Sequence, residues 1–313
     1  MSTDQRMISC GVFVSNSSFS MAISCFDSMR GLYPERMARN VIYCHGANSG
    51  LSFLKNAICD RAGYNPNMDS QVIKKLIDIN RRFYDQFGGS FSATRQRLQP
   101  GVRKVLETIS ADDSVLDLGC GNGHFLRELH DRGHRSPLLG ADFSLPLLRE
   151  AGATPGVEWR EVDLTQLSVV SEQLSVKSYQ LSVTECWSLI TMFAALHHIP
   201  SNEIRLDILR TVKKMLKPGG RFILSNWQFL NSEKLKARIQ PWSRVGLSDS
   251  DVDEGDYLLD WRCGDGEGLR YVHQFSAEEL LRLADQVRMK VEAGFLSDGE
   301  NGRLGLYQTW MPV

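Results

Sequence analysis

Three carboxylates follow short apolar runs in this chain, and a glycine-rich turn follows the first of them. The run 115–118 contains Asp117 and leads into Gly119, Gly121 and Gly123. A glycine turn between a strand and a helix lets a ligand approach the backbone closely, because glycine has no Cβ. An acid beside such a turn suits a cationic ligand that carries an amino group better than it suits a diphosphate. The segment therefore predicts a binding site for a positively charged small molecule.

Two further acids end the next two predicted strands. Asp142 closes the apolar run 137–142, and Asp163 follows the strand predicted over 157–162. A carboxylate offers two oxygens that can accept both hydroxyls of a ribose, so Asp142 indicates a nucleoside position. Phe143 follows directly and can pack on a base. Acids at successive strand ends predict that all three carboxylates line one cleft.

The glycine turn resembles motif I of class I S-adenosylmethionine-dependent methyltransferases. Its third glycine comes one residue earlier than in the dinucleotide fingerprint G-x-G-x-x-G. The resemblance implies S-adenosyl-L-methionine as cofactor, with Asp117 facing the methionine ammonium directly or through water. It also implies that Asp163 accepts from the adenine amino group and that the Leu164 amide serves the ring. Phe193 completes the expected cofactor site. An ordinary strand-to-turn connection and a nucleotide oxidoreductase are the alternatives.

The run 187–196 predicts a fourth buried strand, which ends at His197 and His198. In the resembling family, this strand delivers side chains to the transferred methyl group. The histidine pair is an alternative metal site, but neighbours in an extended strand point apart. We therefore expect one histidine to pack and the other to face the pocket, and we expect no metal. The turn 217–220, Lys-Pro-Gly-Gly, is another mark of the same family.

These segments together predict an α/β fold of the class I methyltransferase type, which is Rossmann-like. We expect a seven-stranded, mostly parallel sheet with helices on both faces, and two final strands paired antiparallel. The methyltransferase domain is expected over 68–313, with an N-terminal helical lid over 70–109 and a C-terminal cap insertion over 227–275. The first lid helix is expected to stop at the glycine pair 88–89.

The lid carries eight Lys or Arg residues against two acids between positions 71 and 104. This excess indicates either a solvated helix face or a surface that meets an anionic substrate or RNA phosphate.

Four short motifs are similar to one methyltransferase subgroup. They are Phe-Ser-Ala-Thr-Arg (91–95), Leu-His-His (196–198), Gly-Asp-Tyr-Leu-Leu-Asp-Trp (255–261) and Arg-Tyr-Val-His-Gln-Phe (270–275). They resemble motifs of the eukaryotic tRNA methyltransferases that esterify 5-carboxymethyluridine at the wobble position. The resemblance implies a modified tRNA uridine as substrate and a small zinc-binding partner protein.

A carboxylate acceptor is already ionised, so the site would need cations rather than a general base. The candidates are Arg95, His198, Arg270 and His273. If the acceptor is a hydroxyl or an amine of a small molecule, His198 or His273 becomes the base. Structural alternatives are that Arg95 anchors the lid and that His273 caps a helix. A cofactor-binding scaffold that activates a partner and catalyses nothing is a third kind of function.

Composition sets outer limits on these hypotheses. The net charge of -1 gives no overall attraction to nucleic acid or to anionic membranes. No run of 18 apolar residues exists, so we expect no membrane-spanning segment. Seven cysteines without a C-x-x-C pair indicate reduced thiols and a cytoplasmic protein. Residues 1–67 show no lasting periodicity and are expected to form a poorly ordered extension, with Met68 as an alternative natural start.

Overall fold

The structure is a computed structural model, and it describes residues 68–93, 97–167, 181, 186–263 and 266–313. The expectations for residues 1–67, for Arg95 and for most of the loop 165–185 lie outside the described residues. Within the described part, no helix is both long enough and apolar enough to cross a membrane.

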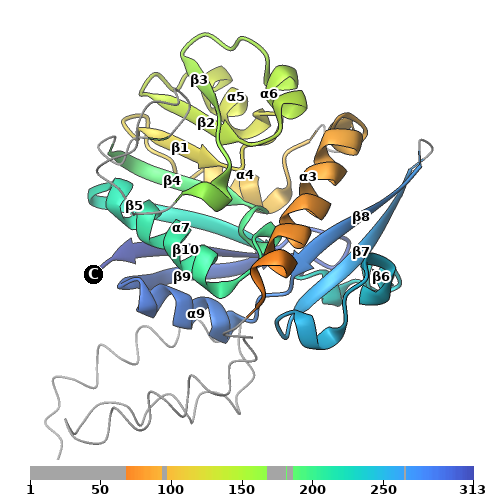
Figure 1. The fold of residues 1–313 in the computed structure, drawn as a ribbon. Coiled ribbons are helices and arrows are strands. Elements are labelled where there is room, and N and C mark those ends of the chain that lie inside the picture. Colours follow the sequence, from red (N-terminus) through yellow and green to blue (C-terminus); the bar gives the residue numbers. More distant parts are fainter. Residues whose placement is uncertain (1–67, 94–96, 168–180, 182–185, 264–265) are drawn as a thin grey trace, which may run out of the picture. The chain divides into compact units, whose positions relative to one another are not determined.

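A seven-stranded sheet forms the centre of the fold (Figure 1). Its strands are β1 (Val115–Leu118), β2 (Leu138–Asp142), β3 (Val157–Glu161), β4 (Trp187–Phe193), β5 (Leu216–Trp227), β9 (Met289–Ser297) and β10 (Gly305–Pro312). They lie in the order β3-β2-β1-β4-β5-β10-β9. β10 is antiparallel to both of its neighbours, and the other pairs are parallel. The predicted α/β class, with a mostly parallel sheet and a final antiparallel pair, is confirmed.

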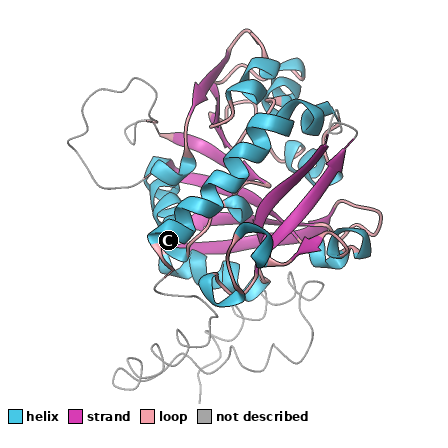
Figure 2. Cartoon of the chain, turned by 45° about the vertical axis from the view of Figure 1, so that its right-hand side comes forward, coloured by secondary structure: helices cyan, strands magenta, loops and turns pink. Residues whose placement is uncertain are grey.

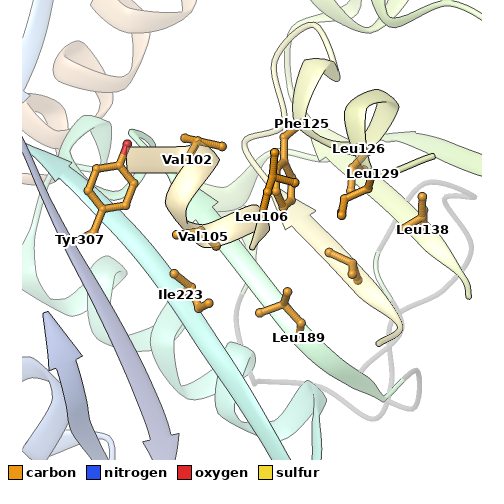
Figure 3. Packing of buried hydrophobic residues seen from close by; sticks show 11 residues of the cluster. Val102, Val105, Leu106, Phe125, Leu126, Leu129, Leu138, Leu189, Ile223 and Tyr307 are labelled. Atoms are coloured by element: carbon orange, nitrogen blue, oxygen red, sulfur yellow. The ribbon is translucent and has the colours of Figure 1, made fainter. Parts of the chain in front are cut away.

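Helices cover both faces of this sheet (Figures 1 and 2). They are α4 (Pro100–Leu106), α5 (His124–Asp131), α6 (Leu145–Ala151), α7 (Asn202–Met215) and α9 (Ala277–Gln286). α4 and α5 share one face, where Val105, Phe125 and Leu189 belong to a buried cluster (Figure 3). Full burial of such side chains stabilises the fold by ~1.5–3 kcal/mol each. Because α4 packs in this core, it supports the sheet rather than covering the cavity described below.

The long helix α3 (Ser70–Ala93) runs between the large sheet and the C-terminal cap (Figure 1). The prediction that this helix stops at Gly88 and Gly89 was wrong. Both glycines lie where α3 approaches α6: a Cβ on Gly88 would lie 3.6 Å from Leu147, and one on Gly89 would lie 3.3 Å from Glu150. Glycine costs a helix interior ~1 kcal/mol relative to alanine. Close packing against α6 offsets that cost.

The cap contains a second sheet of three antiparallel strands, β6 (Ile239–Gln240), β7 (Asp256–Cys263) and β8 (Gly266–His273). The sequence indicated an insertion over 227–275 but not this hairpin. α3 packs directly on β8, where a Cβ on Gly268 would come within 2.8 Å of Phe87 and 2.9 Å of Phe83. The remaining short elements are η1 (Leu164–Gln166), η2 (Leu196–His198), η3 (Phe229–Asn231), α8 (Glu233–Lys236), η4 (Trp242–Val245) and η5 (Asp249–Asp251).

Candidate active site

The glycine turn after β1 combines tight packing with open space. Gly119, Gly121 and Gly123 have positive φ angles of 73°, 56° and 70°, which glycine adopts without steric cost. A Cβ on Gly119 would lie 2.6 Å from Ala195, and one on Gly123 would lie 2.3 Å from Trp159. A Cβ on Gly121 would have nothing within 4 Å. The space beside Gly121 is therefore available to a ligand.

A cavity of about 240 Å³ lies beside this turn, at the carboxyl ends of β1, β2, β3 and β4. Open α/β sheets bind their ligands at this edge. From α3, the side chains of Asn80, Arg81 and Tyr84 line the cavity. The residues predicted from the sequence that also line it are Gly119, Gly121, Asp142, Phe143, Asp163, Leu164, Phe193 and His198.

Asp117 is buried at the end of β1 and lies outside the cavity lining. The expectation that all three carboxylates line one cleft is therefore correct for Asp142 and Asp163 and wrong for Asp117, whose side chain is covered within the sheet. Thr191 Oγ1 donates a 2.7 Å hydrogen bond to its carboxylate. Burial raises the pKa of Asp117 to about 7; the Thr191 hydrogen bond opposes the rise, and the charge of Asp142 adds to it. A cation nearby would favour the ionised form of this acid. Asp117 is thus a buried acid that a cationic group could ionise near neutral pH.

Asp142 is buried between two backbone amides and lines the cavity. Its Oδ2 accepts from Gly121 N at 2.9 Å, and its Oδ1 accepts from Ser144 N at 2.8 Å. Burial raises the pKa of Asp142 against these stabilising hydrogen bonds. Each carboxylate oxygen has a second acceptor site. The carboxylate is therefore held in a fixed orientation and can still accept two donors from a ligand.

Asp163 connects the cavity to α3. Its Oδ1 accepts from Thr165 N at 2.9 Å and from Thr165 Oγ1 at 2.6 Å. Its Oδ2 accepts from Arg81 Nη2 at 2.6 Å, and this ion pair is partly exposed to solvent. Arg81 is one of the eight basic residues of the predicted lid, and the sequence indicated no acidic partner for it. The structure pairs it with an acid of the expected cofactor site.

The two histidines occupy different environments in η2, a short turn rather than the extended strand expected from the sequence. His197 is buried and stacks on Trp227 with parallel rings, and its Nδ1 accepts from Trp227 N at 3.2 Å. His198 lines the cavity. Its Nδ1 lies 3.1 Å from the carbonyl oxygen of Tyr271, and its Nε2 lies 3.0 Å from the hydroxyl of Tyr84. The side chain that can meet a substrate is therefore that of His198.

Arg270 and His273 do not line the cavity. Arg270 is buried between the rings of Phe83 and Trp227, at 4.8 and 5.1 Å from their centroids. Burial lowers the pKa of Arg270, and a hydrogen bond with Tyr84 partly offsets that effect. Arg270 thus stands behind Tyr84, one residue removed from the cavity.

His273 is fully buried within the cap. Its ring nitrogens lie 2.6 Å from Asp256 Oδ1 and 2.9 Å from Glu279 Oε1. Both nitrogens have structural partners, so the geometry gives His273 a role in the cap interior rather than in the cavity.

Asn80 and Tyr84 are two of the lining residues that the sequence did not indicate. Asn80 Nδ2 donates to the carbonyl oxygens of His198 and Tyr271, each at 3.1 Å, and its Oδ1 accepts from Tyr271 N at 2.8 Å. Their signal in the sequence is a polar group on a buried stripe: Leu76, Asn80 and Tyr84 follow at four-residue intervals. A buried polar side chain on such a stripe usually has a specific partner.

Comparison with known proteins identifies the family. A family model described as a methyltransferase domain matches residues 91–292. The chain is 30% identical over 213 residues to a protein of Encephalitozoon cuniculi named "Putative methyltransferase", covering 67% of this chain and 86% of that protein. It is 27% identical over 177 residues to tRNA (carboxymethyluridine(34)-5-O)-methyltransferase ALKBH8 of Macaca fascicularis, covering 55% of this chain and 24% of that protein.

Saccharomyces cerevisiae has a tRNA (carboxymethyluridine(34)-5-O)-methyltransferase that is 25% identical over 158 residues, covering 50% of this chain and 51% of that protein. This chain therefore matches about a quarter of the macaque relative and about half of the yeast one. Among solved structures, the DhpI-SAM-HEP complex superposes with a TM-score of 0.52 at 20% identity, covering 76% of this chain and 98% of that one. That likeness concerns the fold. The chain belongs to the class I methyltransferases, the family that uses S-adenosylmethionine as methyl donor.

Proposed function

We propose that this chain transfers a methyl group from S-adenosylmethionine to a carboxylate carried by a modified uridine of tRNA. The observation that carries the proposal is the similarity to methyltransferases whose names state a carboxymethyluridine substrate. Two features of the chain agree with it. His198 lies in the lining of the cavity, and α3, which contributes to that lining, carries exposed basic residues.

The described residues fit the cofactor. The open space beside Gly121 would receive the part of the cofactor that lies against the protein backbone. Asp142 would accept hydrogen bonds from both hydroxyls of the cofactor's ribose. Asp163 and Leu164 would serve the adenine, with Phe143 packing on it. Asp117, which lies just outside the cavity lining, would meet the ammonium group through water. When bound, the cofactor supplies a methyl group on a positively charged sulfur, already activated for in-line displacement.

Binding of a carboxylate methyl acceptor requires hydrogen-bond donors and positive charge rather than a general base. A carboxylate is a nucleophile in its ordinary state, so the chain's task is to hold and orient it. Charge-assisted hydrogen bonds are the strongest contacts for that purpose. In the described part of the cavity, His198 and Tyr84 are the candidate donors, with Arg270 behind Tyr84. Arg95 remains a candidate from the sequence. His273 is left out, because both of its ring nitrogens contact carboxylates.

The surface of α3 suits an RNA backbone. Lys74, Lys75 and Arg82 are exposed on this helix, and Arg81 beside them is also partly exposed. Each phosphate that such side chains neutralise makes binding more sensitive to salt. We therefore expect binding of the RNA to weaken steeply between low and moderate salt, whereas a small-molecule acceptor would show little dependence.

The test is methyl transfer from labelled S-adenosylmethionine to an anticodon stem-loop that carries 5-carboxymethyluridine at the wobble position. The matched controls are the same stem-loop with unmodified uridine and with the carboxamide. We expect an alkali-labile methyl ester on the first RNA alone. Transfer to a metabolite extract but to none of the RNAs would refute the proposal. The assay is run with and without a small activating partner protein, which the family resemblance makes part of the proposal.

A further inference from the structure

The hydrogen bond between Tyr84 and His198 fixes the position of two protons. A carbonyl oxygen can only accept, so His198 Nδ1, at 3.1 Å from the Tyr271 carbonyl, must carry a hydrogen. In a neutral imidazole the other nitrogen is then an acceptor. Nε2 accordingly accepts from the Tyr84 hydroxyl at 3.0 Å. The hydroxyl hydrogen of Tyr84 therefore points at His198 and away from a ligand.

The groups around His198 favour this neutral state. Arg270 of β8 is positively charged and forms a hydrogen bond with Tyr84. The charge of Arg81 on α3 is balanced by its ion pair with Asp163. Within η2 itself, the ring of His197 lies 4.4 Å from that of His198, centroid to centroid. A further positive charge on His198 would be opposed by Arg270, unless an anion entered the cavity.

We propose that the acceptor carboxylate binds together with one proton, which His198 takes up, and that Tyr84 then turns its hydroxyl hydrogen toward the carboxylate. This inference rests on the proposed function, because it requires an anionic acceptor. A protonated His198 donates from both nitrogens. Its Nε2–H can then donate to the Tyr84 oxygen or to the carboxylate. The pair thus changes from one internal hydrogen bond to a donor site for an anion.

The same arrangement favours release of the product. During transfer, an acceptor oxygen forms the O–CH3 bond while the S–CH3 bond breaks and its electron pair remains on sulfur. The carboxylate becomes a neutral ester and no longer stabilises a protonated histidine. His198 then returns its proton to solvent, and Tyr84 can again donate to Nε2. The proton is taken up on binding and released after transfer, so none is consumed.

The proposal is tested by counting protons. Titration calorimetry with the full chain and S-adenosylhomocysteine is run at pH 8 in two buffers with different ionisation enthalpies, using the carboxymethyluridine stem-loop. We expect uptake of about one proton per RNA bound, and none with the carboxamide stem-loop. Because one proton is taken up with the carboxylate, affinity for the carboxylate RNA should rise by up to about tenfold for each unit by which the pH is lowered.

Two variants distinguish proton uptake by His198 from the structural role of its side chain. His198→Asn can retain a donor for the Tyr271 carbonyl at the position of Nδ1, but it has no group at the position of Nε2 and cannot take up a proton. It is expected to lose the uptake and the pH dependence while cofactor affinity stays within about twofold. Tyr84→Phe keeps the uptake and is expected to lower kcat/KM for the carboxylate RNA at least tenfold. His130→Asn, on the solvent side of α5, is the control and should behave as the wild type.

The results also separate the two proposals. Methylation of the carboxylate RNA without proton uptake would overturn the inference and leave the proposed function standing. Uptake that persists in His198→Asn would overturn it too. If the wild type does not methylate this RNA, the proposed function fails, and the inference fails with it. Should His198→Asn not fold, the difference in proton count between carboxylate and carboxamide RNA on the wild type decides.

Discussion

Replacing Asp117 with asparagine is expected to stabilise the cofactor-free protein above neutral pH and to weaken cofactor binding. The side chain is buried and its pKa is raised to about 7 from 3.8, mainly by burial. The pKa of Asp117 is higher in the folded protein than in the unfolded chain. Its contribution to the free energy of unfolding is therefore fully present below about pH 3.8 and is lost as the pH rises through 7. In the folded protein at pH 8 the carboxylate is therefore ionised at a cost.

The size of the effect follows from the shift. A rise of about three pKa units, at 1.36 kcal/mol per unit, corresponds to about 4 kcal/mol at pH values well above 7. Between pH 5 and pH 8.5, the contribution of Asp117 to the free energy of unfolding changes by about 2–3 kcal/mol. The cost of burying the asparagine amide is constant over this range and cancels in the comparison. The Thr191 hydroxyl can still donate to the asparagine oxygen.

Urea unfolding of wild type and Asp117→Asn at pH 5 and pH 8.5 measures this difference directly. The variant should gain about 2–3 kcal/mol relative to wild type between the two pH values. Calorimetry at pH 8 should show the opposite effect on the cofactor: losing a charge-assisted hydrogen bond of ~1.5–3 kcal/mol lowers affinity about 10- to 100-fold. A stability difference that does not change with pH, or a variant that binds the cofactor as tightly as wild type, would refute the reasoning.

Three further predictions concern the glycine turn, α3 and the buried ion pairs of the cap. Gly121→Ala should still fold, with ~1–2 kcal/mol less stability because its backbone is left-handed, and should bind the cofactor at least tenfold more weakly. Gly123→Ala should unfold at a much lower temperature, because its Cβ would meet Trp159. Asn80→Ala removes two buried hydrogen bonds and one partly buried one, and should cost about 3 kcal/mol in urea unfolding, with reduced transfer and a cofactor Kd within about twofold. Arg205 of α7 is fully buried, and its guanidinium lies within 4.0 Å of the carboxylates of Asp253, Asp256 and Glu279. Arg205→Met removes this charge and should destabilise the fold by ~3–5 kcal/mol; a melting temperature equal to wild type would contradict this.

The features that the sequence predicted well depend on local pattern. Buried runs of four and five residues define β1 and β2, and β4 is buried at five of its seven positions, because inner parallel strands are covered on both faces. The chemistry then follows from topology, since successive parallel strands end at the same edge of the sheet. Asp142 and Asp163 could be assigned to one cavity for this reason.

The features that the sequence did not predict depend on contacts between distant positions. Asn80 meets Tyr271 across 191 residues, and Tyr84 meets His198 across 114. The role of His273 is decided by Asp256 and Glu279, which no spacing rule would bring to both of its nitrogens. The helix α3 continues through two glycines because they pack closely against α6. Local propensity cannot reveal partners that only the folded chain supplies.

One turn of α3 joins three parts of the molecule. Arg81 holds the cofactor-side acid Asp163, Asn80 holds the backbone of His198 and of β8, and Tyr84 holds the His198 ring. These contacts differ in strength. A solvent-exposed ion pair contributes ~0–1 kcal/mol, whereas each buried hydrogen bond contributes ~0.5–1.5 kcal/mol and costs more when one partner is left unsatisfied. The position of α3 is therefore set mainly by its buried contacts with the cap and with His198, and the Arg81 ion pair contributes least.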